Sequence, residues 1–253
     1  MKKRKLIITY SVVIVLLFIL FGIPLPYFSV FPGELIDMGE VINVESDKSH
    51  FYAVSANIYR NPYSKALGLT ENQFEISLFV YIIAKISPSI DIAKIPAGYE
   101  NITTAEIEEY QYSLANQSND LAKKLALEYL DLDEDVSISF GDLAGSSGSL
   151  IAALEIIQQL GNDDLIRDRI IAGTGELQKN GSIAKIGNLK QKISTAENKK
   201  VDILILPKAN QGEFESTIEF LYVENLKDAV EKLVAMAGLN TGHRNISGFS
   251  SRN

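Results

Sequence analysis

Two neighbouring serines lie in a loop of small residues directly before an apolar run. The loop, residues 145–149, reads Gly-Ser-Ser-Gly-Ser, and residues 150–160 are apolar on nearly every side at the length of a helix, which is typical of a buried helix. The start of a helix offers unpaired N–H groups and the positive end of the helix dipole, so this junction suits an anion or a developing oxyanion. A serine here is therefore a candidate nucleophile. The alternative interpretation is a flexible turn with a serine N-cap.

The composition limits which base could activate such a serine. The chain has no cysteine and two histidines, His50 in a charged stretch and His243 in a polar tail. A thiolate and a cysteine-based metal site therefore lack their residues, a Ser-His-Asp triad or a histidine metal site has almost nothing to draw on, and we expect neither metal nor cofactor. A net charge of -8 argues against a nucleic-acid partner, because phosphate binding needs a basic face. Any hydrolase here must use another base.

Known phosphate and dinucleotide motifs fit this chain poorly. The serine loop lacks the Gly-Lys-Ser/Thr ending of a P-loop. The pair Gly173 and Gly175 lacks the third glycine of a dinucleotide fingerprint, because Gln178 stands in its place. The acidic residues 133–135 are explained more simply by a solvated loop than by calcium.

The N-terminus predicts a membrane anchor. Residues 2–5 are basic, and residues 6–23 are uncharged and mostly aliphatic, long enough to span a bilayer. Prolines and aromatic residues follow where a signal peptide would have a cleavage site, so an uncleaved anchor is expected. The basic cluster favours a single-pass protein of the cell membrane with a cytoplasmic N-terminus and an extracellular C-terminal domain.

The rest of the chain predicts an α+β domain of mixed strands and helices. We expect a basic tip and anchor over residues 1–24, the domain over residues 25–239 and a polar tail over residues 240–253. Periodicity, capping and turn signals predict a hairpin of strands 41–44 and 51–56, a capped helix 103–130, strands 136–140, 170–177 and 201–206, and a hairpin turn at 180–181. They also predict that residues 187–193 lead into a helix that reaches about residue 197, and that residues 223–237 form an amphipathic helix. Residues 57–102 form an insertion of unknown role, with a short local helix near residues 76–84.

The ordered motifs of this domain resemble the proteolytic domain of the Lon protease family. The family's Gly-Pro-Ser-Ala-Gly falls on residues 145–149, its Thr-Gly-Glu on 174–176, its Pro-Ile-Gly-Gly-Leu-Lys-Glu-Lys on 185–192 and its Leu-Pro-x-x-Asn on 206–210. This chain has serine for the loop proline, glycine for the alanine, serine for the second loop glycine and Asn188 for the second glycine of the lysine motif.

The resemblance implies the catalytic residues. It places the family's serine nucleophile on Ser147 and its lysine base on Lys192. Thr174 matches the threonine that orients the lysine, and we expect Gly145, Ser146 and Gly148 to form the oxyanion loop. Glu176 receives no role.

A lysine base has to be neutral, and a free lysine of pKa about 10.4 is neutral about once in two thousand at pH 7. Burial would have to lower the pKa of Lys192 by about three units. Its apolar neighbours Leu189 and Ile193 favour such a site. Lys190 is then the solvated lysine of the motif.

The resemblance is strongest to membrane-anchored Lon-like peptidases of Gram-positive bacteria, which work without ATP. Those usually carry a PDZ domain, which we do not expect in this chain. We therefore expect a serine endopeptidase that cleaves secreted or membrane-associated peptides or proteins, and the sequence is compatible with a homo-oligomer. One alternative is an inactive Lon-like fold that acts as a membrane-tethered binding or scaffold protein. Another is an assembly partner whose functional surface is the insertion, residues 57–102.

Overall fold

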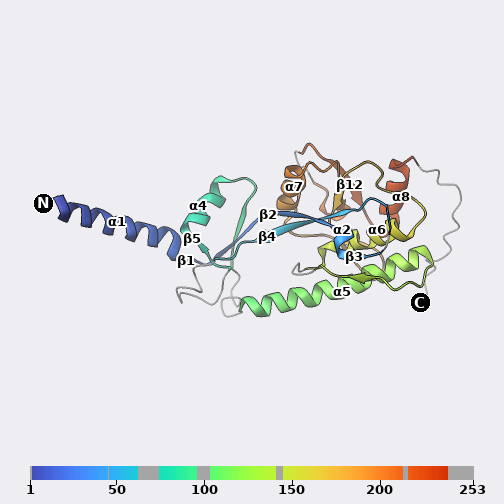
Figure 1. Ribbon diagram of the computed structural model, residues 1–253, viewed down its shortest axis with the longest axis horizontal. Coiled ribbons are helices and arrows are strands. Elements are labelled where there is room, and N and C mark those ends of the chain that lie inside the picture. The colour runs from blue at the N-terminus through green and yellow to red at the C-terminus, as the bar shows by residue number, and fades with distance from the viewer. Residues whose placement is uncertain are drawn as a thin grey trace. The chain divides into compact units, whose positions relative to one another are not determined.

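The computed structural model describes residues 2–44, 46–61, 74–95, 103–140, 145–212 and 216–238. The chain divides into two compact units, a smaller one of residues 1–32 and 56–109 and a larger one of residues 33–55 and 110–253. Helices and strands are mixed along the chain (Figure 1), which confirms the predicted α+β class. The predicted boundaries after residues 24 and 239 stay predictions, and the polar tail lies outside the described residues.

The smaller unit begins with helix α1 (Lys2–Gly22), which is long and apolar enough to cross a membrane. Strand β1 (Pro24–Leu25) follows and pairs with β5 (Ile76–Ser77), and the start of β2 (Tyr27–Asp37) pairs with β6 (Asp91–Lys94). Helix α4 (Leu78–Ile86) confirms the predicted local helix. It lies beside the last turns of α1 (Figure 1). Of the insertion, residues 62–73 and 96–102 lie outside the described residues.

A largely parallel sheet forms the centre of the larger unit. Its strands follow the order β12 (Glu219–Val223), β11 (Ile203–Pro207), β8 (Ile171–Gly173), β4 (Tyr52–Ile58) and β2. The pairs β12–β11, β11–β8 and β8–β4 are parallel. Along β11, Ile203 and Ile205 join one apolar cluster while Leu204 and Leu206 join another. Because side chains alternate along a strand, both faces of this sheet are buried.

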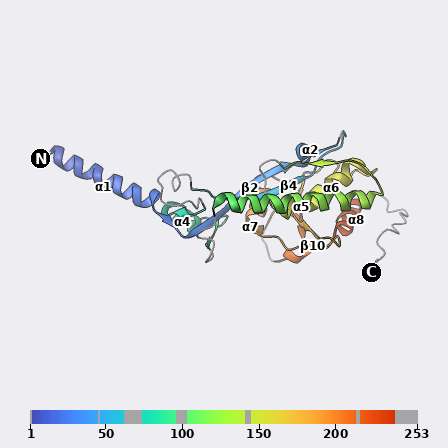
Figure 2. The ribbon, with the colours of Figure 1, turned by 90° about the horizontal axis from the view of Figure 1, so that it is seen from below.

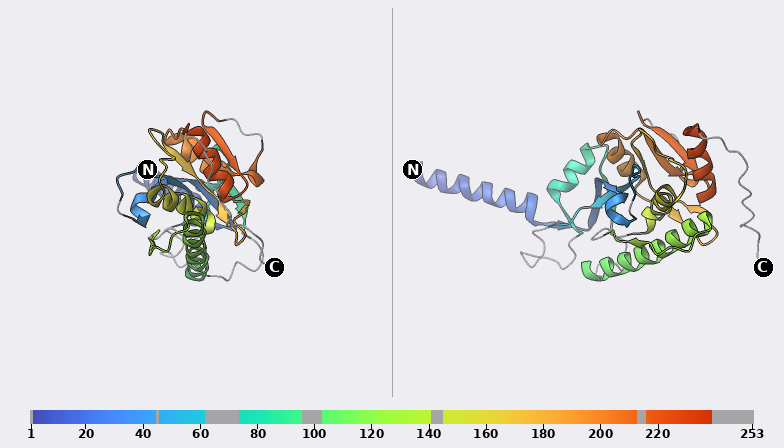
Figure 3. Two further views of the ribbon diagram at one scale, coloured as in Figure 1. Left: turned by 90° about the vertical axis from the view of Figure 1, so that its right-hand side faces the viewer. Right: turned by 45° about the vertical axis from the view of Figure 1, so that its right-hand side comes forward.

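Helices cover the two faces of this sheet. Helix α6 (Ser149–Leu160), helix α8 (Leu226–Met236) and residues Ala122, Leu125 and Ala126 of α5 (Thr104–Leu130) share the cluster on one face. Helix α7 (Leu189–Asn198) packs on the other face through Ile193 and Ala196. Figures 1 and 2 show α5 running alongside α6, and Figure 3 shows α7 and α8 from two further sides. The helix that follows the serine loop and the helix that carries Lys192 thus pack on opposite faces.

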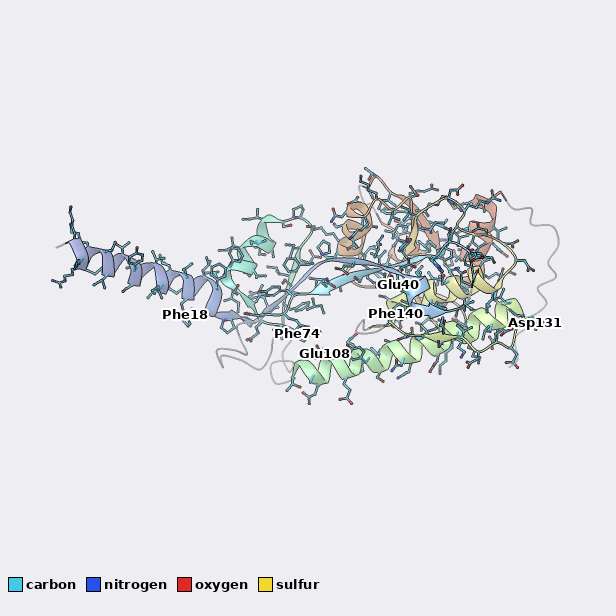
Figure 4. All side chains as sticks on the ribbon, viewed as in Figure 1. Phe18, Glu40, Phe74, Glu108, Asp131 and Phe140 are labelled. Carbon is cyan, nitrogen blue, oxygen red and sulfur yellow. The ribbon has the colours of Figure 1, made fainter. Side chains whose placement is uncertain are left out.

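Several predicted elements are confirmed. Helix α6 is buried along nearly its whole length, and α7, β11 and α8 fall where the patterns placed them. The turn at residues 180–181 joins β9 (Glu176–Leu177) to β10 (Ile183–Ala184) in an antiparallel hairpin. Before α5, the backbone N–H of Thr103 donates to Glu106 at 2.8 Å and the amide of Glu106 donates back to the threonine hydroxyl at 3.3 Å, which is a capping box. Helix α5 ends at Leu130, and the next residue, Asp131, labelled in Figure 4, has a left-handed conformation.

Two strand predictions are wrong. Residues 41–44 and 51–56 do not form a hairpin, because β3 (Ile42–Asn43) pairs with β7 (Ser137–Ile138) while β4 pairs with β8. Asp37 caps a short helix α2 (Met38–Val41) by accepting from the Gly39 amide, and this helix replaces the start of the predicted strand. The predicted strand 170–177 is also interrupted, and it divides into β8 and β9. Alternation identifies a strand but does not name its partner.

Strands β2 and β12 were not predicted. Pro32 and Gly33 lie within β2, and both residue types normally argue against a strand interior. Here the close approach of two strands accounts for the glycine, since a Cβ on Gly33 would lie 2.3 Å from Ser55 Oγ. The adjoining Glu34 amide donates to this hydroxyl at 2.8 Å.

Candidate active site

Ser147 lies in the short 3-10 turn η1 (Ser146–Gly148), which leads directly into α6. Gly145 before the turn has φ +107°, a conformation that glycine adopts far more readily than other residues. A Cβ on Gly148 would lie 3.2 Å from the ring of Phe140, which is labelled in Figure 4. The small residues of this loop therefore permit the tight turn that presents Ser147.

Lys192 reaches Ser147 from helix α7. Its Nζ donates to Ser147 Oγ at 2.7 Å and to Thr174 Oγ1 at 2.8 Å. Lys192 is 5% exposed and Thr174 is fully buried, whereas Lys190 on the same helix is more accessible. The structure therefore brings together the three side chains that the motifs singled out, and their catalytic roles stay predictions.

The break between β8 and β9 joins the serine turn to the sheet. The Thr174 amide donates to the carbonyl of Ile205 at 3.1 Å, which continues the hydrogen bonding between β8 and β11. The next amide, that of Gly175, instead donates to the carbonyl of Ser147 at 2.7 Å. Thr174 Oγ1 donates to the same carbonyl at 3.0 Å. A Cβ on Gly175 would lie 2.7 Å from Leu150 Cδ2, so a larger residue here would displace the Leu150 side chain. These bonds fix Ser147 relative to the end of β8.

Helix α7 is fixed at its start and in its middle. Asn188 precedes it with φ +54°, a left-handed conformation that asparagine tolerates better than most residues. This explains asparagine at a position where the Lon motif has glycine. Thr195, one turn beyond Lys192, accepts from the Gly33 amide at 2.8 Å and donates to the Gln191 carbonyl at 3.0 Å. The helix is thereby held against β2 with Lys192 directed toward η1.

Burial lowers the pKa of Lys192 to about 8. Within the part of the chain that the structure describes, no carboxylate forms an ion pair with this lysine. A group of pKa about 8 is neutral in about one molecule in ten at pH 7, against about one in two thousand for a free lysine. The site therefore raises the neutral fraction of an amine that lies beside a hydroxyl.

The other two serines of the loop have different partners. Ser146 Oγ donates to Glu176 Oε2 at 2.6 Å. Ser149 Oγ donates to the carbonyl of Ser146 at 2.9 Å and accepts from the Leu177 amide at 2.9 Å. Ser149 and Glu176 thus link the turn to β9. Sequence reasoning gave neither a role, and no sequence signal could have done so, because the partners meet only where the strand breaks.

His50 contacts a buried carboxylate rather than a serine. Its Nδ1 lies 2.6 Å from Glu155 Oε1, and the Phe51 amide donates to Glu155 Oε2 at 2.8 Å. Glu155 is fully buried in α6, and burial raises its pKa. This pair ties the loop before β4 to α6. Because His50 contacts Glu155, the basic side chain that contacts Ser147 is Lys192.

Residues 144–236 match the family model of the Lon protease (S16) C-terminal proteolytic domain. They form a Lon-like domain. An archaeal Lon protease of Halobacterium salinarum is 26% identical over 146 residues, which cover 53% of this chain and 20% of that protein. Lon protease 1 of Borreliella burgdorferi is 35% identical over 95 residues, which cover 35% of this chain and 11% of that protein.

The Lon-like match includes all three residues of the hydrogen-bonded site. This chain spans a fifth or less of the length of these curated relatives. The match and the relatives support peptidase activity for the domain. Figure 1 places the matched region in the part coloured from yellow-green to red.

Proposed function

We propose that this protein is a membrane-anchored serine endopeptidase that uses Ser147 as nucleophile and Lys192 as base and needs no ATP. Its substrates are secreted or membrane-associated peptides or proteins. The observation that carries the proposal is the 2.7 Å hydrogen bond between Lys192 Nζ and Ser147 Oγ, made by a lysine whose burial lowers its pKa to about 8. A buried lysine without a carboxylate partner is costly to keep charged, and this cost favours the neutral base that a serine nucleophile requires.

The reaction follows from this pair. Neutral Lys192 accepts the hydroxyl proton of Ser147 as Oγ forms a bond to the carbonyl carbon of a peptide. The protonated lysine then gives this proton to the departing amine as the peptide C–N bond breaks. A water molecule, deprotonated by the same lysine, attacks the resulting ester and releases the acid with Ser147 restored.

Thr174 is a positioning residue in this scheme. Its hydroxyl hydrogen is directed to the Ser147 carbonyl, so its lone pairs accept from Lys192. A neutral amine has two N–H groups and one lone pair. Because one N–H is held by Thr174, the lone pair is free to turn toward Ser147 Oγ as the proton moves.

The oxyanion donors come from the start of η1. The Ser149 amide donates to the carbonyl of Ser146, and the Leu150 amide donates to Gly175. These amides are occupied, so we assign the oxyanion hole to the backbone amides at the start of η1, that of Ser147 first, at the positive end of the α6 dipole.

Helix α1 is the proposed anchor. Most of its apolar side chains are exposed in the folded chain, which matches a helix surrounded by lipid rather than by protein. The basic residues Lys2, Lys3, Arg4 and Lys5 at its start favour a cytoplasmic N-terminus. The peptidase site is then extracytoplasmic.

A cleavage assay without ATP tests the proposal. The full chain in detergent micelles is given a fluorogenic peptide mixture and, separately, an unfolded protein. Ser147→Ala and Lys192→Ala should each lose about a thousandfold or more in rate. Lys190→Ala is the matched control, because it removes a more accessible lysine from the same helix, and Ser146→Ala removes the adjacent serine; both should keep most of the activity.

Covalent labelling provides a readout that does not depend on the substrate chosen. A serine-directed fluorophosphonate should modify Ser147, as located by peptide mass spectrometry, and labelling should fall in Lys192→Ala but not in Lys190→Ala. Equal cleavage by wild type and Ser147→Ala, or labelling on Ser146 instead, would refute the assignment.

A further inference from the structure

Helix α4 in the smaller unit carries an apolar stripe that faces away from the protein. Phe79, Ile82, Ile83 and Ile86 are exposed by 38%, 43%, 37% and 77%. Their spacing of three, four and seven positions places them on one face of the helix. Apart from the contact of Phe79 with α1, the described residues of the unit leave much of this face exposed.

The opposite face of α4 already fulfils the ordinary packing role of a helix. Val80 and Ala84, one turn apart, are buried, and Ser77 caps the helix by accepting from the Val80 amide. The helix is therefore apolar on both faces, and the fold of the unit uses only one. Exposed apolar patches of this kind mark contact surfaces.

The stripe is continuous with the exposed apolar surface of α1. The rings of Phe21, at the end of α1, and Phe79 lie 4.7 Å apart between centroids. Phe18, labelled in Figure 4, is a further exposed ring on the same helix, 52% accessible. The uncovered face of α4 thus begins where the candidate membrane span ends.

The polar atoms around α4 match the edge of a bilayer. Tyr27 and Tyr81 pack edge to face with centroids 5.2 Å apart, and Lys85 Nζ lies 5.6 Å from the centre of the Tyr81 ring. Tyrosines gather where hydrocarbon meets headgroups, and lysines extend from there toward water and anionic phosphates. Lys94 pairs with Tyr27 in the β2–β6 ladder and is exposed. Strand β6 also carries one acidic residue, Asp91.

We infer that α4 is a membrane-interface helix that inserts Phe79, Ile82, Ile83 and Ile86 into the leaflet from which α1 emerges. The inference rests on the proposed anchoring by α1. Helix α4 is too short to span a bilayer, so it lies along the interface, about 5–10 Å into the boundary between headgroups and acyl chains. This second contact ties the smaller unit to the membrane surface as well as to the span.

The absence of cysteine from the chain makes the test direct. Single cysteines replace Ile82 or Ile86 on α4, Leu16 on α1 and the exposed Thr217 of the larger unit, and each carries an environment-sensitive nitrobenzoxadiazole label. The full chain is reconstituted in vesicles of phosphatidylcholine and phosphatidylglycerol. Quenching is measured with spin-labelled lipids and with aqueous iodide.

We expect the labels at Ile82 and Ile86 to lose about half of their emission with the shallow lipid quencher and to resist iodide, as for an interfacial helix. The label at Thr217 should be quenched by iodide and should keep its emission with the lipid quencher. If Leu16 is lipid-quenched while the α4 labels respond to iodide, the interface helix is refuted and the anchor stands. If the Leu16 label is also open to iodide, the anchor itself fails. Labels on α4 that are shielded from both quenchers would show a second copy or another protein on the stripe, which also overturns the inference.

Discussion

The rate of peptide cleavage should follow the neutral fraction of Lys192 as pH changes. Burial lowers the pKa of this lysine to about 8. Because the base acts only when neutral, kcat/KM should rise about tenfold per pH unit below this value and level off above it. Between pH 6 and pH 8 the neutral fraction increases about fiftyfold, and kcat/KM should increase by the same factor.

The assay is the initial rate of fluorogenic peptide cleavage at substrate concentrations well below KM, for the full chain in detergent, with circular dichroism recorded at each pH to exclude unfolding.

Thr174→Val adds a second perturbation. It removes the acceptor that holds Lys192 Nζ at 2.8 Å and the donor to the Ser147 carbonyl. We expect about a 10- to 100-fold loss in kcat, with KM nearly unchanged and partial rescue in Thr174→Ser.

Two results would refute this reasoning. A profile that is flat from pH 6 to pH 9 would show that no titrating lysine limits the rate. A midpoint that moves in His50→Gln would assign the base elsewhere, because His50 contacts Glu155 in the described structure rather than Ser147.

Three predictions concern stability, each measured by urea unfolding. Lys192→Met should be inactive, yet its free energy of unfolding at pH 7 should be higher by about 1–2 kcal/mol. Burying the charged ammonium destabilises the folded state by about 3 kcal/mol, and the two hydrogen bonds of Lys192 offset part of this cost. The unfolded chain binds more protons between pH 8 and 10.5, so wild-type stability should rise with pH across this window and the variant's should not. Ser149→Ala should cost about 1–3 kcal/mol by leaving the Leu177 amide unpaired; a loss below about 0.5 kcal/mol would mean that water replaces the hydroxyl. Glu155→Ala should cost about 3–5 kcal/mol and Glu155→Gln less, because the amide oxygen can still accept from Phe51; equal losses would contradict this account.

Local patterns determined much of the larger unit in advance. The apolar run after the serine loop could only be a buried helix, and α6 is fully enclosed except at its C-terminal end. The capping box at Thr103, the turn at residues 180–181 and the strand before Pro207 were predicted for local reasons. Such features depend on neighbours within a few positions, so no tertiary information is needed to find them.

Pairing between distant segments could not be predicted in this way. Residues 42–43 alternate as a strand should, yet their partner is β7 rather than β4. The segment at residues 170–177 looks continuous, but the Gly175 amide turns away from the ladder to meet Ser147. In both cases alternation identifies the strand but not its partner, which depends on contacts between segments that are distant in the sequence.

The sequence determined the identities of Ser147, Thr174 and Lys192 as candidates, through the order of the motifs that contain them. Only the tertiary structure decided that they touch. It bends the chain after β8, starts α7 from a left-handed Asn188 and packs the two helices on opposite faces of one sheet. Lys192 lies in a stretch of sequence that is mostly polar apart from Leu189 and Ile193, and its pKa falls because the fold removes water from it. Burial is a property of the folded chain, so the sequence could name this lysine as a base, while the lowered pKa that the role requires arises only when the chain folds around it.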